Sequence, residues 1–245
     1  MRPPYLLLSA LPTALSAPTL PPLNTSTLAV TFGMLVFPGF QALDVFGPLD
    51  VLNSLSSLYN LPATIGMHLD ILAATPGPVS TALNASGGSF GQEIVVSTTF
   101  EQFMAEGRGM DVLHVPGGLG TRNNVSAEIA FMRDVAPREN YILAICTGAT
   151  IAARTGILDG RRATTNKKSW AWATSTGPRV QWQRTAQWVV DGNVWSSSGV
   201  AAGMDAVFAW VGSVYGEDVA GYVGDYIEYR RARDAGDDPF AGVWE

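Results

Sequence analysis

The chain contains one cysteine, Cys146, and the residues around it predict a nucleophile. An apolar run of strand length, residues 141–145, leads into Cys146, and Thr147, Gly148 and a helix-forming run of small residues follow it. A strand that turns directly into a helix presents the corner side chain at the carboxyl edge of a sheet. Amides at the helix N-terminus also favour a thiolate there. The alternative is a small buried apolar residue, as most free cysteines are.

A thiolate nucleophile needs a proton partner and hydrogen-bond donors for developing charge. The two histidines, His68 and His114, both fall inside expected strands, so we interpret them as satisfied core or sheet-face residues. This disfavours a Cys–His–Asp triad and a histidine-bearing metal site. Asp44 follows the first expected strand, and burial beside a sulfur raises the pKa of a carboxyl so that it keeps its proton. The alternative role for Asp44 is a helix cap.

Gly117 and Gly118 directly follow another strand-like run and allow the backbone to approach a ligand closely. The backbone amides of Gly118 and Thr147 are therefore candidates for an oxyanion pocket, and an ordinary tight turn is the alternative for the glycines. Trp170 and Trp172 are candidates to line an apolar pocket, although core packing is the expected role of at least one.

The hydrophobic patterns alternate between strands and helices along the chain, which predicts a largely parallel α/β sheet with helices on both faces. Ligands of such sheets bind at the carboxyl ends of the strands, so the residues named above should converge there. The expected strands are 27–37, 67–73, 110–115, 141–145 and 162–166, with hairpins in 75–99 and 187–198. The expected helices are 48–58, 125–135 with Ser126 as N-cap, 149–154 with Gly156 as its stop, 167–174, 199–215 and 217–233, and a tail from 237 to 245 folds back.

Composition limits the classes of function. The 245 residues are 47% hydrophobic with a net charge of −6, which argues against a nucleic-acid partner. No apolar run is long enough to span a bilayer. We expect residues 1–27 to be a Pro-rich N-terminal arm, with a secretory signal as the alternative, and residues 28–245 to be one domain. The expected location is cytoplasmic, with secretion as the alternative.

Four blocks of sequence carry a family resemblance. They are FPGFQALDVFGPLDVL (37–52), VPGGLG (115–120), AICTGATIAARTGILDGRRATTN (144–166) and SSGVAAGMD (197–205). Together they resemble the ThiJ/PfpI superfamily and, within it, the isonitrile hydratase branch, over residues 31–240. The resemblance implies a flavodoxin-like three-layer α/β sandwich, a homodimer, and a reaction without metal or organic cofactor.

The resemblance also implies roles for individual residues. It places the nucleophile at Cys146, the acidic partner at Asp44 and the oxyanion amides at Gly118 and Thr147. Relatives often have His where this chain has Asn166, and Asn cannot relay a proton at neutral pH. Asn166 is therefore expected to line the substrate pocket, and mechanisms that need a histidine at that position are disfavoured.

The activity implied by the resemblance is a cofactor-independent, cysteine-dependent hydro-lyase acting on a small molecule. It adds water to an isocyanide and yields an N-substituted formamide through a cysteine thioimidate. One alternative is a glyoxalase- or deglycase-like lyase acting on α-oxoaldehydes, or a lyase of secondary metabolism. The other is a non-enzymatic cysteine redox sensor. A transcriptional regulator is disfavoured because no helix-turn-helix segment or basic domain follows the core.

Overall fold

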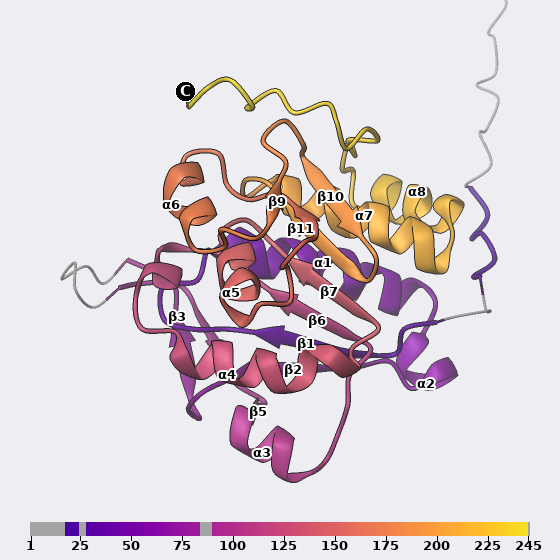
Figure 1. Ribbon diagram of the computed structural model, residues 1–245. Helices are drawn as coiled ribbons and strands as arrows, with labels where there is room; N and C mark the ends of the chain where they lie inside the picture. Colours follow the sequence, from indigo (N-terminus) through magenta and orange to yellow (C-terminus); the bar gives the residue numbers. More distant parts are fainter. Residues whose placement is uncertain (1–17, 25–27, 84–89, 245) are drawn as a thin grey trace, which may run out of the picture.

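A computed structural model describes residues 18–24, 28–83 and 90–244. A seven-stranded sheet crosses its middle in the order β10-β11-β7-β6-β1-β2-β5 (Figure 1). All neighbouring strands of this sheet run parallel except β10, which is antiparallel to β11. The strands are β1 (Thr31–Leu35), β2 (His68–Ala73), β5 (Thr98–Thr99), β6 (Val112–Val115), β7 (Tyr141–Ala144), β10 (Trp188–Asp191) and β11 (Val194–Ser197). The predicted parallel α/β sheet is confirmed.

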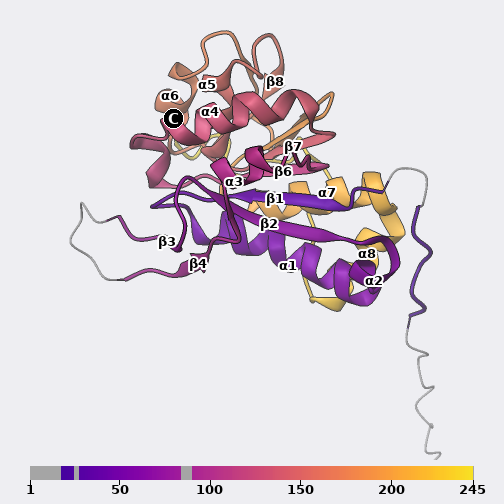
Figure 2. The same cartoon turned by 90° about the horizontal axis from the view of Figure 1, so that it is seen from below.

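Helices cover both faces of the sheet and make three layers (Figure 2). One face packs against α3 (Phe100–Ala105), α4 (Ser126–Val135) and α5 (Gly148–Thr155). The other packs mainly against α1 (Ala42–Leu58), α7 (Ala202–Tyr215) and α8 (Glu217–Tyr226), where Trp210 and Tyr215 are among the largest fully buried side chains. The two apolar clusters sandwich the sheet, which holds the ends of its central strands rigidly.

The remaining elements are short. The predicted hairpin within 75–99 is present as β3 (Pro78–Ser80) and β4 (Glu93–Val95), which pair antiparallel. A second small sheet pairs β8 (Arg162–Ala163) with β9 (Gln181–Trp182). The other short elements are α2 (Leu61–Ile65), α6 (Trp170–Ser175), η2 (Leu119–Arg122) and η3 (Ala136–Arg138).

Helix α1 begins six residues before the predicted start, and this changes the setting of Asp44. We expected Pro48 in the first turn, but the helix begins at Ala42 with Gln41 as its N-cap, and Pro48 lies inside it. Asp44 therefore lies within the first turn of the helix, not at a junction ahead of it. The Gln41 side chain makes no capping hydrogen bond, so the start of α1 carries no local sequence signal.

Other helix boundaries also differ from the predictions: α6 begins at Trp170, not 167, and α7 at Ala202, not 199. Helix α8 ends at Tyr226, not 233, because Glu228 adopts a left-handed φ of 55° and the Tyr229 amide donates back to the Gly224 carbonyl. Ser126 is the first residue of α4 and not its N-cap; its amide donates to the Asn124 side chain. Helix α3 was not predicted, although the Thr99–Gln102 capping box at its start is a sequence signature.

The carboxyl ends of β1, β6 and β7 are adjacent, because these strands are neighbours in the sheet. The turns that follow them carry Asp44, Gly117 and Cys146. The N-terminal arm predicted for residues 1–27 lies outside the described residues except for 18–24. Within the described ranges, no helix has both the length and the apolar character that a bilayer span requires.

Candidate active site

Cys146 occupies a strained corner between β7 and α5. Its φ is 55°, a left-handed conformation that residues with a side chain rarely adopt. The turn is closed by the Gly148 amide, which donates to the Ile145 carbonyl at 2.8 Å. A Cβ at position 148 would lie 2.1 Å from the Val115 carbonyl oxygen, so only glycine fits there. The predicted nucleophile elbow is present, and Gly156 ends α5 in a left-handed conformation.

The Asp44 carboxyl is completely buried and faces this corner. Its Oδ2 accepts a hydrogen bond from the Gly117 amide at 2.8 Å. Its Oδ1 is buried without a hydrogen bond of ordinary geometry, and the side chain lies within interaction range of the Cys146 thiol. Asp44 is thus brought to the sulfur by a turn that lies 73 residues away in the chain.

Burial controls the protonation of both groups. Desolvation raises the pKa of Asp44 to about 7, despite the hydrogen bonds from Gly117 and Cys146 that oppose it. Burial, and then the charge of Asp44, raise the pKa of the Cys146 thiol, while hydrogen bonds from Thr147 and Asn166 oppose the rise. The Thr147 amide favours the thiolate as expected, but burial of the thiol, which is only 4% exposed, outweighs it and raises the pKa. Because the charge of Asp44 further raises the pKa of Cys146, the two acids titrate as one coupled pair.

Gly117 and Gly118 lie in the turn after β6 and contact the segments that follow β1 and β7. A Cβ on Gly117 would lie 2.5 Å from the Thr147 amide nitrogen and 2.9 Å from Asp44 Oδ2. Gly118 has a φ of 134°, and its amide donates to Thr147 Oγ1 at 2.9 Å. Both glycine amides are therefore already engaged, and only the Thr147 amide of the expected oxyanion pair faces the sulfur.

Two threonines that were not predicted as site residues hold the corner in place. Thr165 Oγ1 donates to the Cys146 carbonyl at 2.9 Å. Thr121 Oγ1 donates to the Gly118 carbonyl at 2.7 Å and lies 3.2 Å from Thr147 Oγ1. Thr165 belongs to the ATTN block that carried the resemblance, whereas no sequence signal pointed to Thr121.

Asn166 and Trp170, the two predicted pocket residues, have different surroundings. Asn166 Oδ1 accepts from the Ser169 amide at 3.0 Å, which leaves the amide nitrogen to hydrogen-bond the sulfur. Trp170 packs edge-on against Trp182, with the cations of Lys167 and Arg184 over its ring.

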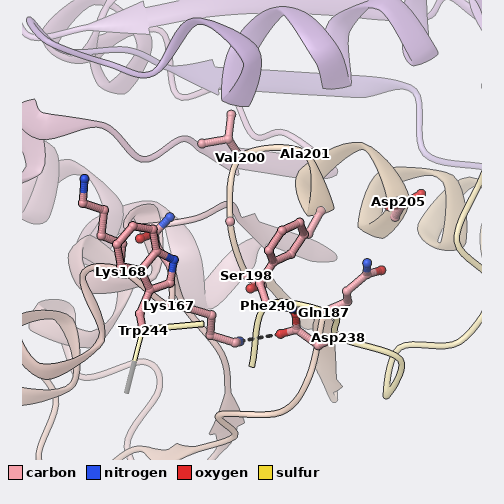
Figure 3. Close-up of a pocket in the computed structure, with 13 residues that line it drawn as sticks. Lys167, Lys168, Gln187, Ser198, Val200, Ala201, Asp205, Asp238, Phe240 and Trp244 are labelled. Atoms are coloured by element: carbon pink, nitrogen blue, oxygen red, sulfur yellow. Dashed lines mark hydrogen bonds and ion pairs between the residues drawn. The ribbon is translucent and has the colours of Figure 1, made fainter. Parts of the chain in front are cut away.

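A cavity of about 320 Å³ lies between the segment that precedes α6, the segment that precedes α7 and the C-terminal tail. Figure 3 shows side chains that line it. Asn166 is part of its wall, whereas neither Cys146 nor Trp170 is. The other wall residues are Lys167, Lys168, Gln187, 198–202, Asp205, Asp238, Phe240 and Trp244.

The histidines do not take part in this site. His68 lies at the start of β2 with an exposed side chain, 3.3 Å from Asp70 Oδ1. His114 is buried in β6, and neither ring nitrogen has a hydrogen-bond partner among the described residues, so it is not the satisfied core histidine that we expected. Its burial lowers its pKa to about 4. Within the described ranges, no group of three or more His, Cys, Asp or Glu side chains could hold a metal ion.

Two curated relatives match the chain over different lengths. Isonitrile hydratase from Pseudomonas putida is 31% identical over 207 residues, which are 84% of this chain and 81% of that protein. The HTH-type transcriptional regulator GbdR from Pseudomonas aeruginosa is 30% identical over 129 residues, which are 52% of this chain and only 35% of the regulator. The second likeness is therefore limited to a part of the regulator.

Solved structures show the same fold. A ThiJ/PfpI family protein from Pseudomonas syringae superimposes with a TM-score of 0.67 at 26% identity, over 90% of this chain and 86% of that one. Drosophila melanogaster DJ-1beta gives a TM-score of 0.66 at 18% identity, over 83% and 100% of the two chains. Residues 31–212 also match the sequence pattern of the DJ-1/PfpI family. With its elbow cysteine and three-layer fold, this chain belongs to the DJ-1/PfpI family.

Proposed function

We propose that this protein is an isonitrile hydratase, which adds water to an isocyanide and releases an N-substituted formamide. The supporting observation is the buried Asp44 carboxyl, with a pKa near 7, beside the single cysteine of the chain. A carboxyl that keeps its proton near neutral pH can protonate carbon, which an ordinary surface aspartate cannot do at that pH. The 31% identity to the Pseudomonas putida enzyme supports the same reaction.

The first half of the reaction forms a covalent intermediate. The Cys146 sulfur bonds to the terminal isocyanide carbon as Asp44 transfers its proton to that carbon. The product is a thioimidate, Cys–S–CH=N–R, and Asp44 is left as a carboxylate. The Thr147 amide and the Asn166 side chain, which both hydrogen-bond the sulfur, stabilise its anionic form before the attack.

The second half returns the enzyme to its starting state. Asp44 removes a proton from water as the oxygen attacks the thioimidate carbon, and it then passes this proton to the nitrogen. Asp44 next accepts the hydroxyl proton as the C–S bond breaks. Formamide leaves, with the thiolate and the protonated carboxyl restored. All atoms are accounted for by one isocyanide and one water, and no redox partner is required.

The test uses chromatography to measure the formation of N-cyclohexylformamide from cyclohexyl isocyanide. We expect turnover by the wild type and none above background by Cys146→Ala. Asp50→Asn is the matched control for Asp44→Asn, because Asp50 lies on the same helix but is exposed. Full turnover by Cys146→Ala, or equal losses in the two aspartate variants, would contradict the mechanism. Lactate from methylglyoxal in the same assay would favour the oxoaldehyde alternative.

We also propose that the enzyme is a homodimer, as the family resemblance implies. Leu43 and Leu119 are apolar and exposed beside Asp44 and Gly118, which supports an assembly surface next to the site. Light scattering during gel filtration gives the mass directly, against 26.0 kDa for one chain.

A further inference from the structure

We infer that three residues of the C-terminal tail, Asp238, Phe240 and Trp244, form part of the wall of a cavity that binds the organic substituent of the substrate. In this assignment, Phe240 and Trp244 select isocyanides with a bulky, apolar substituent. The inference depends on the proposed function for the identity of the reacting group. The cavity itself can be tested without turnover.

The tail is fastened to the body of the molecule at both of its ends. Lys167 Nζ lies 3.1 Å from Asp238 Oδ2, and both side chains are almost fully buried (Figure 3). At the far end, the Lys168 ammonium lies 5.2 Å from the centre of the Trp244 ring, and Arg184 donates to the Trp244 carbonyl at 3.3 Å. The tail thus runs back from α8 across the region of α6 and β10 (Figure 1).

The charged side chains of the cavity wall already have partners. Besides Asp238, the Lys167 ammonium is bound by Thr164 Oγ1 at 3.0 Å and the Ala186 carbonyl at 2.9 Å. Asp205 accepts from the Ala232 amide at 2.8 Å. A cationic substituent would therefore lose its water without gaining a carboxylate that lacks other partners.

Apolar groups make up much of the remaining wall. Phe240 and Trp244 contribute rings that are still more than half exposed, and Val200 and Ala201 contribute aliphatic surface beside them. Covering this surface with an apolar ligand is favourable, at about 25 cal/mol per Å² of apolar area. The volume of about 320 Å³ is at the lower end of the range for small-molecule sites and accommodates a ring.

Asn166 connects this cavity to the sulfur. Its side chain hydrogen-bonds Cys146, and the same residue forms part of the cavity wall. Gly199 also lies in the wall, next to Asn166: a Cβ added at position 199 would lie 3.7 Å from Asn166 Nδ2. An isocyanide group is a short linear rod, so on this inference a molecule with its ring in the cavity points its terminal carbon toward Asn166, whose side chain contacts the sulfur.

The kinetic test compares substrates that differ only in the substituent. For cyclohexyl isocyanide we expect Phe240→Ala and Trp244→Ala to raise KM about tenfold with kcat nearly unchanged. For methyl isocyanide, which is too small to fill the cavity, KM should change less than twofold. Val243→Ala is the matched control, because Val243 is an exposed apolar residue of the same tail outside the cavity wall. Equal effects on both substrates, or none in either variant, would overturn the inference.

A binding test separates this inference from the proposed reaction. N-Cyclohexylformamide should slow the alkylation of Cys146 by iodoacetamide in the wild type and in Val243→Ala, but about tenfold less effectively in Phe240→Ala. If the protein hydrates no isocyanide yet shows this protection, the proposed function fails and the binding cavity stands. If the formamide gives no protection in the wild type, the cavity assignment itself is wrong.

Discussion

Cys146 and Asp44 are two acids in one place that excludes water, and the protein must remove one proton from the pair to work. Thiolate with carboxylic acid, and thiol with carboxylate, are two arrangements of the same single proton. Burial raises the pKa of both groups, and ionisation of Asp44 raises the pKa of Cys146 further. In the proposed reaction, the thiolate with the carboxylic acid is the reactive arrangement. It coexists with the thiol–carboxylate arrangement only after the doubly protonated pair has lost one proton.

The first prediction concerns the pH dependence of the rate. We expect kcat/KM to rise with pH through about 7, because below that value both acids are protonated and the sulfur is not nucleophilic. Above it the rate should level off, since the second proton is held far more tightly. Initial rates between pH 5.5 and 9 measure this profile. A flat profile across that range would show that the pair does not share a proton.

The second prediction concerns removal of the carboxyl. Asp44→Asn can still accept from the Gly117 amide but cannot protonate carbon, so we expect kcat/KM to fall about 100-fold or more. The acid limb should move to higher pH, because the thiol must then ionise alone in a buried place. The same profile for Asp50→Asn should match the wild type. If the rise of kcat/KM with pH in Asp44→Asn occurred at the same pH as in the wild type, the rise would have to come from the titration of another group.

Among the elements, three turns from neighbouring strands form one unit. The Gln41 amide donates to the Gly117 carbonyl at 2.8 Å, and the Gly120 amide donates to the Gly39 carbonyl at 3.0 Å. Ile145, just before the elbow, donates to Val115 at 2.9 Å. These backbone bonds hold Asp44 and Cys146 together more firmly than side-chain contacts alone would.

The third prediction tests this close approach of backbone to site. Gly117→Ala places a methyl group 2.5 Å from the Thr147 amide nitrogen, so both turns must move apart. We expect a loss of about 2 kcal/mol in unfolding free energy and at least a tenfold loss in kcat/KM. Gly109→Ala is the control, because a Cβ there meets nothing within 4 Å and its stability should stay within about 0.5 kcal/mol. Wild-type activity in Gly117→Ala would show that the turns tolerate separation.

For the whole molecule, two buried groups give opposite dependences of stability on pH. His114 has a folded pKa of about 4, below its unfolded value of 6.5, so its contribution to stability rises with pH across that window. Asp44 has a folded pKa of about 7, above its unfolded value of 3.8, so its contribution is fully present below 3.8 and is lost as pH rises to 7. The two contributions largely cancel between pH 4 and 6.5.

The fourth prediction separates these contributions by substitution. Relative to wild type, the unfolding free energy of Asp44→Asn should rise with pH by about 1.4 kcal/mol per unit between pH 4 and 6.5. The unfolding free energy of His114→Leu, relative to wild type, should fall with pH at the same rate, because this variant lacks the His114 contribution that rises with pH. Denaturant titrations at pH 4.5, 5.5 and 6.5 measure the slopes. Differences from wild type cancel the contributions of other titrating groups to the pH dependence of stability. One such group is Glu139, whose pKa is also raised, to about 8. Parallel curves for all three proteins would contradict both assignments.

Much of the fold was predictable from the sequence because its signals are local. The apolar run before Cys146, the small residues after it and the glycine stop at 156 lie within sixteen consecutive residues and specify an elbow. The turn at 191–193 likewise predicted the β10–β11 hairpin. The boundaries that failed, at the start of α1 and the end of α8, depend on backbone hydrogen bonds without a typical capping residue.

By itself, the sequence determined which side chains can do chemistry and that the carboxyl ends of parallel strands bring them together. Only the tertiary structure decided how protons are shared between Cys146 and Asp44, that the Gly118 amide is already engaged, that His114 lacks partners and that the tail closes a cavity beside Asn166. The physical reason is that desolvation and hydrogen bonding at a site add up over all of its neighbours. Those neighbours come from turns and strands that are far apart in the chain, so no local pattern of residues records their sum.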